Sequence, residues 1–388
     1  MKKLLKIASI LVLIYFLATL LVPSIVDRAK NKTRILPPYQ VSEKAQEIYN
    51  SLDFVADMHC DALLWDRNLL KKNTYGHVDI PRMLEASIGI QAFTIVTKSP
   101  KGQNFDKNTG DSDNITTLMI AQGQSIKSWS SLTKRALIQC KELHRFARES
   151  EGTFRVITSK IDLEKYIIDK KTNNNVTAGF LGVEGAHALD GKLENIDILY
   201  NAGVRMMAPT HFFDNKLGGS AHGTSKEGLT DFGKKVIVKM QSKNMIVDVA
   251  HASPKIIDAI LEMTTKPIVS SHTGVKGTCN NVRNLSDKHI KGIAKTGGII
   301  SIAMFKQAVC GISVKATADA IKYVIDLVGA DFVALGSDFD GSVHTSIDIT
   351  GLPLIVDELL NLGISENDIQ KIMGQNVKRL LLEQLPQN

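Results

Sequence analysis

Cysteine is scarce in this sequence, and the four cysteines do not have the spacing of metal ligands or of a disulfide scaffold. Cys60, Cys140, Cys279 and Cys310 are scattered over 388 residues. They show no metal-ligand spacing, and four scattered thiols do not make a disulfide scaffold for a domain of this size. We therefore expect packed free thiols.

Net charge is nearly absent from most of the chain. The whole sequence has a formal net charge of +7, but residues 1–35 hold seven Lys/Arg and one Asp and so account for +6 of it. Residues 36–388 thus carry about +1, which gives no argument for a nucleic-acid partner. With 44% hydrophobic residues, the chain is too apolar for a disordered protein and long enough for a substantial core.

Charged residues are missing from Ile7–Val26, a run of 20 residues that lies between two basic flanks. This pattern is typical of a signal peptide or of a membrane anchor. The length suits a single span better than the shorter apolar region of a cleaved signal. We therefore expect an uncleaved anchor at residues 1–35 and an exported domain at residues 36–388. Small residues at Val22-Pro23-Ser24 keep cleavage and secretion as the alternative.

Beyond a Pro37-Pro38 linker, short apolar runs rich in β-branched residues alternate with segments of helical periodicity. The runs expected as strands are Phe54–His59, Ile90–Val96, Ala178–Glu184, Val204–Thr210, Met245–Ala250, Ile268–Ser271, Gly298–Phe305 and Phe332–Gly336. The helices expected between them include Leu229–Lys243, Pro254–Met263, Ser286–Lys295 and Val314–Val328. Apolar strands that alternate with helices indicate a parallel sheet covered on its outer face. Eight such units predict an α/β fold, a closed (β/α)₈ barrel of the TIM type.

The segment between the second and third expected strands, residues 100–176, is longer than one crossover. Its periodicity predicts a long helix at Thr117–Arg148 and another near Ile161–Lys171, which we interpret as a helical insertion on the barrel. Val41–Leu52 is expected as a short amphipathic helix before the first strand. Ser365–Leu385 is expected as the final helix, with Ser365 as its N-cap.

Residues able to bind metals end most of these strands. In such barrels the carboxyl ends of the strands converge on one face, where active sites are found. The strand-end residues are His59 and Asp61 after the first strand, Glu184 after the third, His211 after the fourth, His251 after the fifth, His272 after the sixth and Asp338 after the eighth. We therefore expect the His59/Asp61 pair, Glu184, His251 and His272 to lie around one axis.

The first of these strand ends reads Asp57-Met58-His59-Cys60-Asp61. Because strand side chains alternate between faces, Asp57, His59 and Asp61 are expected on one face and Met58 and Cys60 on the other. An imidazole and a carboxylate two residues apart form a pincer for a divalent metal.

The number of potential ligands indicates more than one metal ion. Imidazoles and carboxylates suit zinc and would also accept manganese, cobalt or iron. The five residues His59, Asp61, Glu184, His251 and His272 are too many ligands for one tetrahedral catalytic zinc that keeps an open position. They fit two metals bridged by a carboxylate, with Glu184 in the middle.

Other polar residues are expected in supporting or unrelated places. His187 and His222 lie near the expected mouth, where they could contact a substrate. Asp57, Asp248 and Asp340 are expected to orient ligands or loops. The histidines expected at the surface are His77, His144, His289 and His344.

Six motifs occur in order along the chain: Asp57-Met58-His59-Cys60-Asp61, Gly182-Val183-Glu184-Gly185-Ala186-His187, Asp248-Val249-Ala250-His251-Ala252-Ser253, Ser271-His272-Thr273, Arg283-Asn284 and Gly336-Ser337-Asp338-Phe339-Asp340-Gly341. Over roughly residues 45–380, these motifs resemble those of the membrane dipeptidase (renal dipeptidase-like) family of metallopeptidases. Individually these motifs are modest, but their order and strand-end placement together are specific.

The resemblance implies a two-zinc, amidohydrolase-type barrel that hydrolyses dipeptides with a metal-bridging hydroxide. By motif, His59 and Asp61 would hold one zinc ion, His251 and His272 the other, and Glu184 would bridge them.

The resemblance also implies roles for three residues that bind no metal. His211, in Pro209-Thr210-His211-Phe212, matches the family histidine that contacts the scissile carbonyl. Arg283 matches the arginine that grips the substrate carboxylate, and Asp338 matches the acid/base. The sequence departs from the family pattern at Ala186, often a second glycine, and at Cys60, commonly asparagine.

The expected partners are a dipeptide substrate and, through residues 1–35, a membrane; the sequence leaves open whether the protein forms a homodimer. One alternative is a related metal-dependent hydrolase acting on a cyclic amide, a lactone or an N-acyl amino acid. Many such barrels use a carboxylated lysine as the bridge, where this sequence offers Glu184. Another alternative is a membrane-tethered, non-catalytic binding protein, against which the complete ligand set argues.

Overall fold

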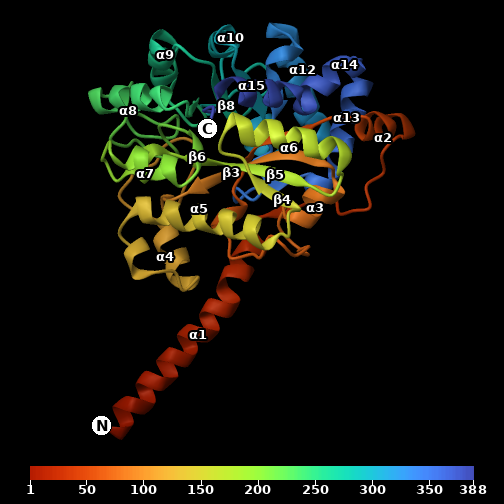
Figure 1. Cartoon of the computed structure of the whole chain (residues 1–388). Coiled ribbons are helices and arrows are strands. Elements are labelled where there is room, and N and C mark those ends of the chain that lie inside the picture. Colours follow the sequence, from red (N-terminus) through yellow and green to blue (C-terminus); the bar gives the residue numbers. More distant parts are fainter.

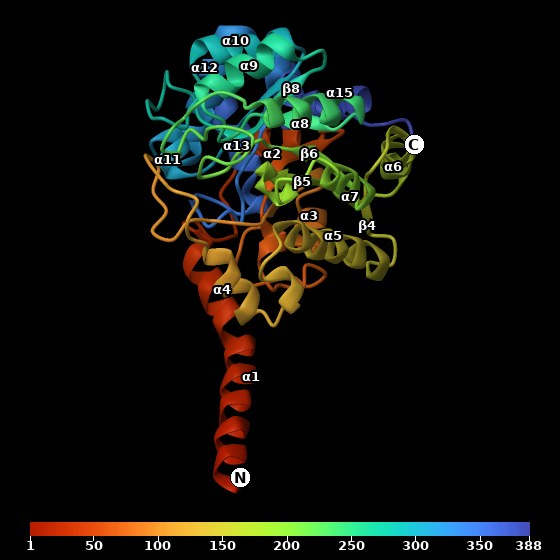
Figure 2. The ribbon, with the colours of Figure 1, turned by 90° about the vertical axis from the view of Figure 1, so that its left-hand side faces the viewer.

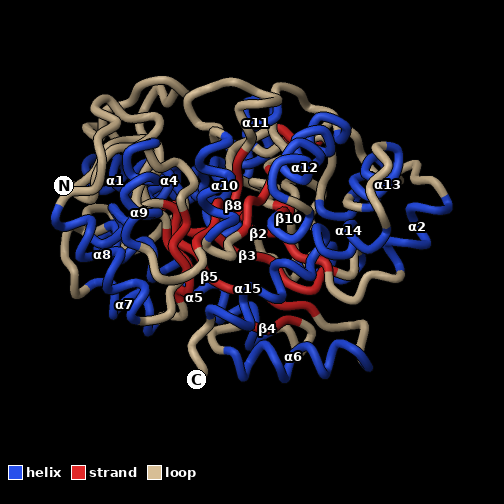
Figure 3. The backbone as a smooth tube through the Cα atoms, turned by 90° about the horizontal axis from the view of Figure 1, so that it is seen from above, coloured by secondary structure: helices blue, strands red, loops and turns tan.

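Eight parallel strands form a closed barrel in the computed structural model, which describes the backbone of residues 1–388 and all side chains except those of residues 11, 14 and 20. The strands are β2 (Val55–Cys60), β3 (Ile88–Val96), β5 (Thr177–Glu184), β6 (Val204–Met207), β7 (Ile246–Asp248), β8 (Ile268–Thr273), β9 (Ile299–Ile302) and β10 (Val333–Leu335). Figure 3 shows these strands at the centre, with the helices around them. The (β/α)₈ prediction and its eight strands are thereby confirmed.

The barrel closes between β3 and β5. Residues Ile90–Val96 of β3 pair in continuous register with Ala178–Glu184 of β5. This pairing occupies one edge of β5. The other edge is shared, because β4 (Phe154–Val156) pairs with β5 at Thr177–Gly179 and β6 pairs farther along, at Leu181–Val183. Strand β4, which the sequence did not suggest, therefore lies beside the barrel as an extra strand.

Helices surround the barrel and continue the alternation expected from the sequence (Figure 1). Those described are α2 (Glu43–Asn50), α3 (Ile80–Glu85), α4 (Asn114–Ala121), α5 (Leu132–Glu149), α6 (Lys160–Thr172), α7 (Asn195–Asn201), α8 (Asp231–Ser242), α9 (Pro254–Met263), α10 (Asp287–Lys295), α11 (Lys306–Val309), α12 (Val314–Val328), α13 (Pro353–Asn361), α14 (Glu366–Gln370) and α15 (Asn376–Gln384). Serine caps begin many of them; the Ser286 side chain, for example, accepts a hydrogen bond from His289 N at the start of α10.

The apolar core has two main clusters, one inside the barrel and one between the barrel and the helices. One cluster receives residues from all eight barrel strands, among them Met58, Phe180 and Met206, and it is therefore the interior. Residues of α15 complete this cluster. The larger cluster joins the outward side chains of the strands to the helices. The closed interior leaves the carboxyl ends of the strands as the face on which polar groups gather.

The expected alternation along β2 fails at its end. Met58 packs in the barrel interior, whereas Cys60 packs in the outer cluster, so the two residues do not share a face as expected. The cause is an irregularity in the pairing of β2 with β3 between Asp57 and Cys60. Such a bulge shifts the alternation by one residue and re-aims the side chains that follow it. His59 is thereby free to point into the site.

The insertion between β3 and β5 contains more breaks than its periodicity predicted. The expected helix Thr117–Arg148 is wrong as one element, because α4 ends at Ala121 and α5 begins at Leu132. Gly123 adopts a left-handed conformation with φ of 66°, which ends a helix. Ser131 then caps the start of α5 through the backbone N of Lys134. The second expected helix, Ile161–Lys171, is confirmed as α6.

The carboxyl-terminal helix is also divided. Ser365 caps α14 as expected, but the helical path is interrupted at Lys371–Gln375 before α15 begins. Gly374 has non-helical backbone angles there, and a Cβ at this position would collide with the Phe54 carbonyl. Close approach of this turn to the start of β2 therefore requires glycine.

Helix α1 (Lys2–Lys30) leaves the body of the protein as a long rod (Figure 2). Among the described residues it is the helix long and apolar enough to cross a membrane, a test that a signal sequence also passes. Its last turn reaches the body of the protein beside α4. Lys32–Thr33, which form β1, then pair with β11 (His344–Thr345) in the loop after β10.

Candidate metal centre

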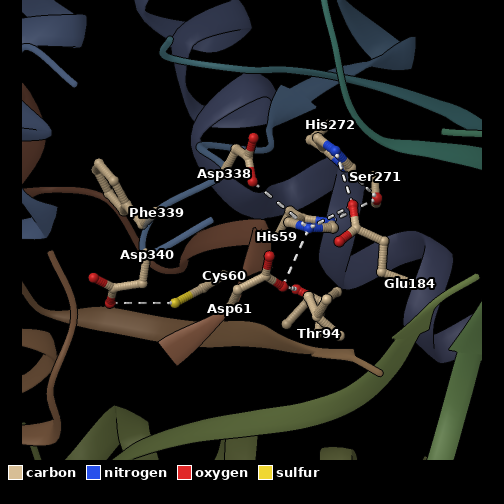
Figure 4. A network of polar contacts seen from close by, with 12 residues as sticks. His59, Cys60, Asp61, Thr94, Glu184, Ser271, His272, Asp338, Phe339 and Asp340 are labelled. Atoms are coloured by element: carbon tan, nitrogen blue, oxygen red, sulfur yellow. Dashed lines mark hydrogen bonds and ion pairs between the residues drawn. The ribbon is translucent and has the colours of Figure 1, made fainter. Parts of the chain in front are cut away.

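The predicted metal ligands meet at the carboxyl ends of the barrel strands, around Glu184. Figure 4 labels four of them: His59, Asp61, Glu184 and His272. The Nε2 atoms of His251, His272 and His59 lie 2.9, 3.3 and 3.5 Å from Glu184 Oε1. Asp61 joins them, with its Oδ1 3.5 Å from His59 Nε2. All five side chains are almost completely buried. The fold therefore brings the five predicted ligands into one small polar centre.

A single hydroxyl sets the proton positions on two of these histidines. Ser271 Oγ donates to Asp248 Oδ2 over 2.6 Å, so its remaining lone pairs can only accept. It lies 3.0 Å from His59 Nδ1 and 3.1 Å from His272 Nδ1. Both imidazoles must then donate from Nδ1 to Ser271 Oγ, which leaves Nε2, on the side of Glu184, as the nitrogen that can bind a metal ion. Asp248 thus orients ligands through Ser271, in agreement with the orienting role expected for it.

The polar centre favours positive charge. Burial raises the pKa of Glu184 well above its usual range, and the neighbouring Asp61 carboxylate raises it further. Burial by itself would lower the pKa of His59, but the Glu184 and Asp61 carboxylates outweigh it and raise that pKa to about 10. Carboxylate oxygens and Nε2 lone pairs pointing at one another need a cation between them. The residues present therefore fit divalent metal ions.

Two further predicted residues border the ligand cluster. His211 Nε2 lies 3.2 Å from Glu184 Oε2, and burial lowers the pKa of this imidazole well below its usual range. Asp338 Oδ1 lies 3.9 Å from His59 Nε2 on the opposite side. Burial raises the pKa of the Asp338 carboxyl to about 7. A neutral imidazole and a carboxyl able to exchange protons near neutral pH thus flank the centre.

Arg283 presents a buried guanidinium next to the same cluster. Its Nη2 donates to His272 O over 2.9 Å. Nε and Nη1 have no hydrogen-bond partner among the described residues, although the side chain is buried. A buried cation with free donors is costly unless another group completes its hydrogen bonds. The missing partner suits a bound anion such as a carboxylate.

The structure adds supporting residues that the sequence motifs did not reveal. Thr94 Oγ1, from β3, donates to Asp61 Oδ1 over 2.6 Å and fixes the direction of that carboxylate. Asp57 accepts from Ser337 N and Ser337 Oγ, both at 2.7 Å, and so fastens the end of β10 to β2. Asp57 therefore orients a loop, as expected. Thr94 lies outside the sequence motifs. Ser337 lies within the motif Gly336–Gly341, but that motif does not reveal its contact with Asp57, 280 residues away.

Two of the remaining histidines, His222 and His187, were expected near the mouth of the site. His222 stacks on Phe212 and lies beside His251, with ring centroids 5.1 Å apart, so it borders the site. His187 is buried as well, and burial lowers its pKa to about 3.

Two histidines expected at the surface are buried instead. His77 accepts from Asp340 N, and His289 contacts Asp258. Both lie at loop or helix positions whose burial depends on neighbours distant in sequence, which a local pattern does not reveal. His344 is exposed, as expected.

The expectation of free thiols holds for two cysteines and is wrong for two. Cys60 and Cys140 are buried thiols, whereas Cys279 and Cys310 form a disulfide with Cα atoms 5.3 Å apart. Barrel closure brings the loop after β8 beside the end of α11, although 31 residues separate the two cysteines. The disulfide lies four residues before Arg283 and therefore helps to fix the segment that carries this guanidinium.

Comparisons with known proteins agree with this geometry. The model of the family described as "Membrane dipeptidase (Peptidase family M19)" matches residues 42–387. "Dipeptidase 3" of Mus musculus is 26% identical over 319 residues, which cover 79% of this chain and 63% of the mouse protein. "Dipeptidase tcpJ" of Claviceps purpurea is 26% identical over 349 residues, or 88% of this chain and 77% of that protein. The chain thus spans less than two thirds of the mouse relative.

Solved structures share the fold. A metallopeptidase from Rhodobacter sphaeroides, liganded with a phosphinate mimic of the dipeptide L-Ala-D-Ala, superposes with a TM-score of 0.70 at 22% identity, covering 86% of this chain and 100% of that one. A probable dipeptidase from Pseudomonas aeruginosa gives 0.73 at 19% identity, covering 88% of this chain and 97% of that one. At such identities the likeness establishes the barrel architecture.

The shared Ser271 hydroxyl generates a first prediction. Ser271→Ala removes the acceptor of the Nδ1 hydrogen bonds of His59 and His272, so affinity for a divalent metal ion should fall about 10- to 100-fold. The measurement is titration of the metal-free protein against a chromophoric chelator. Ser301→Ala is the matched control, because Ser301 is also buried on a barrel strand and its hydroxyl has no partner among the described residues. Equal affinity of the two variants would contradict the role of Ser271.

Proposed function

Because the chain belongs to the membrane dipeptidase family (peptidase family M19), we propose that it is a membrane-anchored dipeptidase that uses two zinc ions. The observation that carries the proposal is the convergence of three histidine Nε2 atoms on Glu184, with the unsatisfied Arg283 guanidinium beside them. The first feature fits metal-assisted hydrolysis, and the second fits a substrate that carries a free carboxylate.

In this proposal the ligands divide into two pairs joined by one bridge. His59 and Asp61 would hold one zinc ion, His251 and His272 would hold the other, and Glu184 would serve both. The contacts of all three histidines with Glu184 Oε1 support a bridging position for this carboxylate. When bound, the two ions supply electrophilic activation of the attacking water and of the scissile carbonyl.

The protein's own side chains orient the substrate and move the proton. A neutral His211 donates a hydrogen bond from Nε2 to the carbonyl oxygen as negative charge develops there. Asp338 accepts a proton from the attacking water and delivers it to the leaving amine nitrogen. One C–O bond forms and the peptide C–N bond breaks. A carboxyl pKa of about 7 suits a group that must both accept and donate a proton near neutral pH.

Arg283 gives the proposal its preference for short substrates. Its free Nε and Nη1 each lie next to Nη2, which has a second N–H, so a carboxylate can bind one free donor together with Nη2. A carboxyl terminus bound close to the metal centre leaves room for one residue on the carboxyl side of the scissile bond. The same contact would serve an N-acyl amino acid, so substrates of that class are the second candidate.

The amino-terminal segment gives the proposed location. Residues 1–35 would anchor the protein in a membrane, and residues 36–388 would form the exported catalytic domain. The length and composition of α1 support this arrangement.

A substrate panel tests the proposed function. The full-length, zinc-loaded protein in detergent should hydrolyse dipeptides, including one with a D-residue at the second position, the stereochemistry of the mimic bound to the Rhodobacter sphaeroides relative. N-acetyl amino acids, a cyclic amide and a lactone complete the panel, with amine or acid release as the measurement. Chelation should abolish turnover and added zinc should restore it. Exclusive hydrolysis of the cyclic amide or lactone would overturn the dipeptidase proposal.

Asp338→Asn tests the proposed acid/base. The amide cannot accept the proton, so kcat should fall by about a hundredfold to ten-thousandfold. Bound metal, measured by elemental analysis, should stay at the level of the unmodified protein. Asp331→Asn is the control, because Asp331 lies at the opposite end of the same strand and is exposed. Full activity of Asp338→Asn would remove Asp338 from the mechanism.

Arg283→Lys tests the carboxylate contact. Lysine keeps the charge but not the paired donors, so KM for a dipeptide should rise about 30-fold or more, a loss of about 2 kcal/mol or more. KM for the same dipeptide with an amidated carboxyl terminus should change little. Arg205→Lys is the matched control, since Arg205 is a largely buried arginine that donates to backbone carbonyls away from the site. Equal losses on the acid and the amide would refute a carboxylate-specific role.

A further inference from the structure

The end of helix α1 is built into the catalytic domain. Asp27 and Asn31 are buried, whereas Arg28 and Lys30 beside them are exposed. Val26 packs against an apolar cluster that contains Leu64 and Trp65, in the turn directly after β2. Figure 2 shows α1 reaching the body beside α4. A simple tether would need no buried carboxylate at this point, because apolar packing alone can fasten a helix end.

Asp27 begins a chain of buried ion pairs that leads toward the metal centre. Asp27 Oδ2 lies 2.9 Å from Arg67 Nε, and Arg67 Nη2 lies 2.7 Å from Asp340 Oδ2. The three side chains are almost inaccessible to solvent. One guanidinium therefore joins a carboxylate of α1 to a carboxylate two residues from Asp338. Removal of one member would leave its partner buried with an uncompensated charge.

Asn31 makes a second connection to the same loop. Its Nδ2 donates to Asp27 Oδ1 over 2.8 Å, and its Oδ1 accepts from Ser342 N over 2.9 Å. The loop Asp338–Ser342 is thus held by α1 at Ser342 directly and at Asp340 through Arg67. Trp65 Nε1 also donates to Asp340 O, over 2.7 Å, which adds a contact from the turn on which α1 packs.

This loop has a backbone conformation that needs external support. Asp338, Asp340 and Ser342 have φ values of 63°, 62° and 62°, in the left-handed region that residues other than glycine rarely adopt. Such a conformation persists only where the surrounding contacts determine it. The contacts from Arg67 and Asn31 lie at two of these three positions, and the third position carries the proposed acid/base.

We propose that Asp27 and Asn31 are positioning residues of the active site, through which the last turn of α1 holds the loop that aims Asp338 at the metal centre. The inference deepens the proposed function and rests on it for the role of Asp338. Helix α1 is then more than an anchor, because its carboxyl-terminal turn completes the catalytic machinery.

Variants of the full-length protein in detergent test this inference. Asp27→Asn keeps the shape of the side chain and removes its charge, and Asn31→Ala removes the contact with Ser342. Both should lower kcat on a dipeptide about 10- to 100-fold, because displacing a catalytic group by about 1 Å has effects of that size. KM and bound zinc should stay unchanged, since neither residue contacts the ligands or Arg283. Lys30→Gln is the matched control, with an exposed charge on the same helical turn.

Hydrogen exchange provides a measurement that does not depend on turnover. The amides of residues 338–342 should exchange about tenfold faster in both variants than in Lys30→Gln, because their local structure opens more often. Asn31→Ala decides the question if Asp27→Asn fails to fold. Unchanged exchange and unchanged kcat, even with a lower melting temperature, would reduce the contact to a docking role and overturn the inference. An unmodified protein that hydrolyses no dipeptide would refute the proposed function, whereas the exchange result would still show whether α1 holds the loop.

Discussion

The rest of the site depends on the electrostatic repulsion among the buried carboxyl groups around Glu184. Three carboxyl groups and several imidazole lone pairs share a buried space, and two like charges about 4 Å apart repel by about 4 kcal/mol at an effective dielectric constant near 20. The fold maintains this arrangement through partners outside the cluster, such as Ser271 with Asp248 and Thr94 with Asp61. These partners fix directions without neutralising charge. The cluster therefore keeps the arrangement of ligands that suits cations.

The barrel tolerates this buried polar cluster. Its interior is filled by an apolar cluster to which every strand contributes, so the core is complete without the polar residues at the strand ends. The bulge in β2 aims His59 at the centre. The left-handed backbone at Asp338, just after the neighbouring strand β10, directs the Asp338 carboxyl toward the same centre. Local irregularities thus lie at the functional rim, where the packing of the core does not forbid them.

Much of this organisation could be predicted from the sequence, because strand periodicity and polar strand ends are local signals. The eight strands and the meeting of His59, Glu184, His251 and His272 followed from those signals and from the topology of a barrel. The division of Thr117–Arg148 into two helices, the disulfide between Cys279 and Cys310, and the burial of His77 could not be predicted in this way. The helix break comes from one glycine turn, a local feature that the strong periodicity of the segment concealed. The disulfide and the burial of His77 depend on neighbours far along the chain: a loop brought beside α11, and a carboxylate 263 residues away. Ser271 illustrates the same limit, since nothing in its immediate sequence reveals that one hydroxyl serves two ligands.

That shared hydroxyl constrains how the centre can change during evolution. His59 and His272 belong to different halves of the proposed pair of metal sites, yet both rely on the lone pairs of the same oxygen. A substitution at position 271 therefore cannot retune one half while sparing the other. Descendants of this protein could therefore adjust the two proposed metal sites independently only by exchanging the ligands themselves.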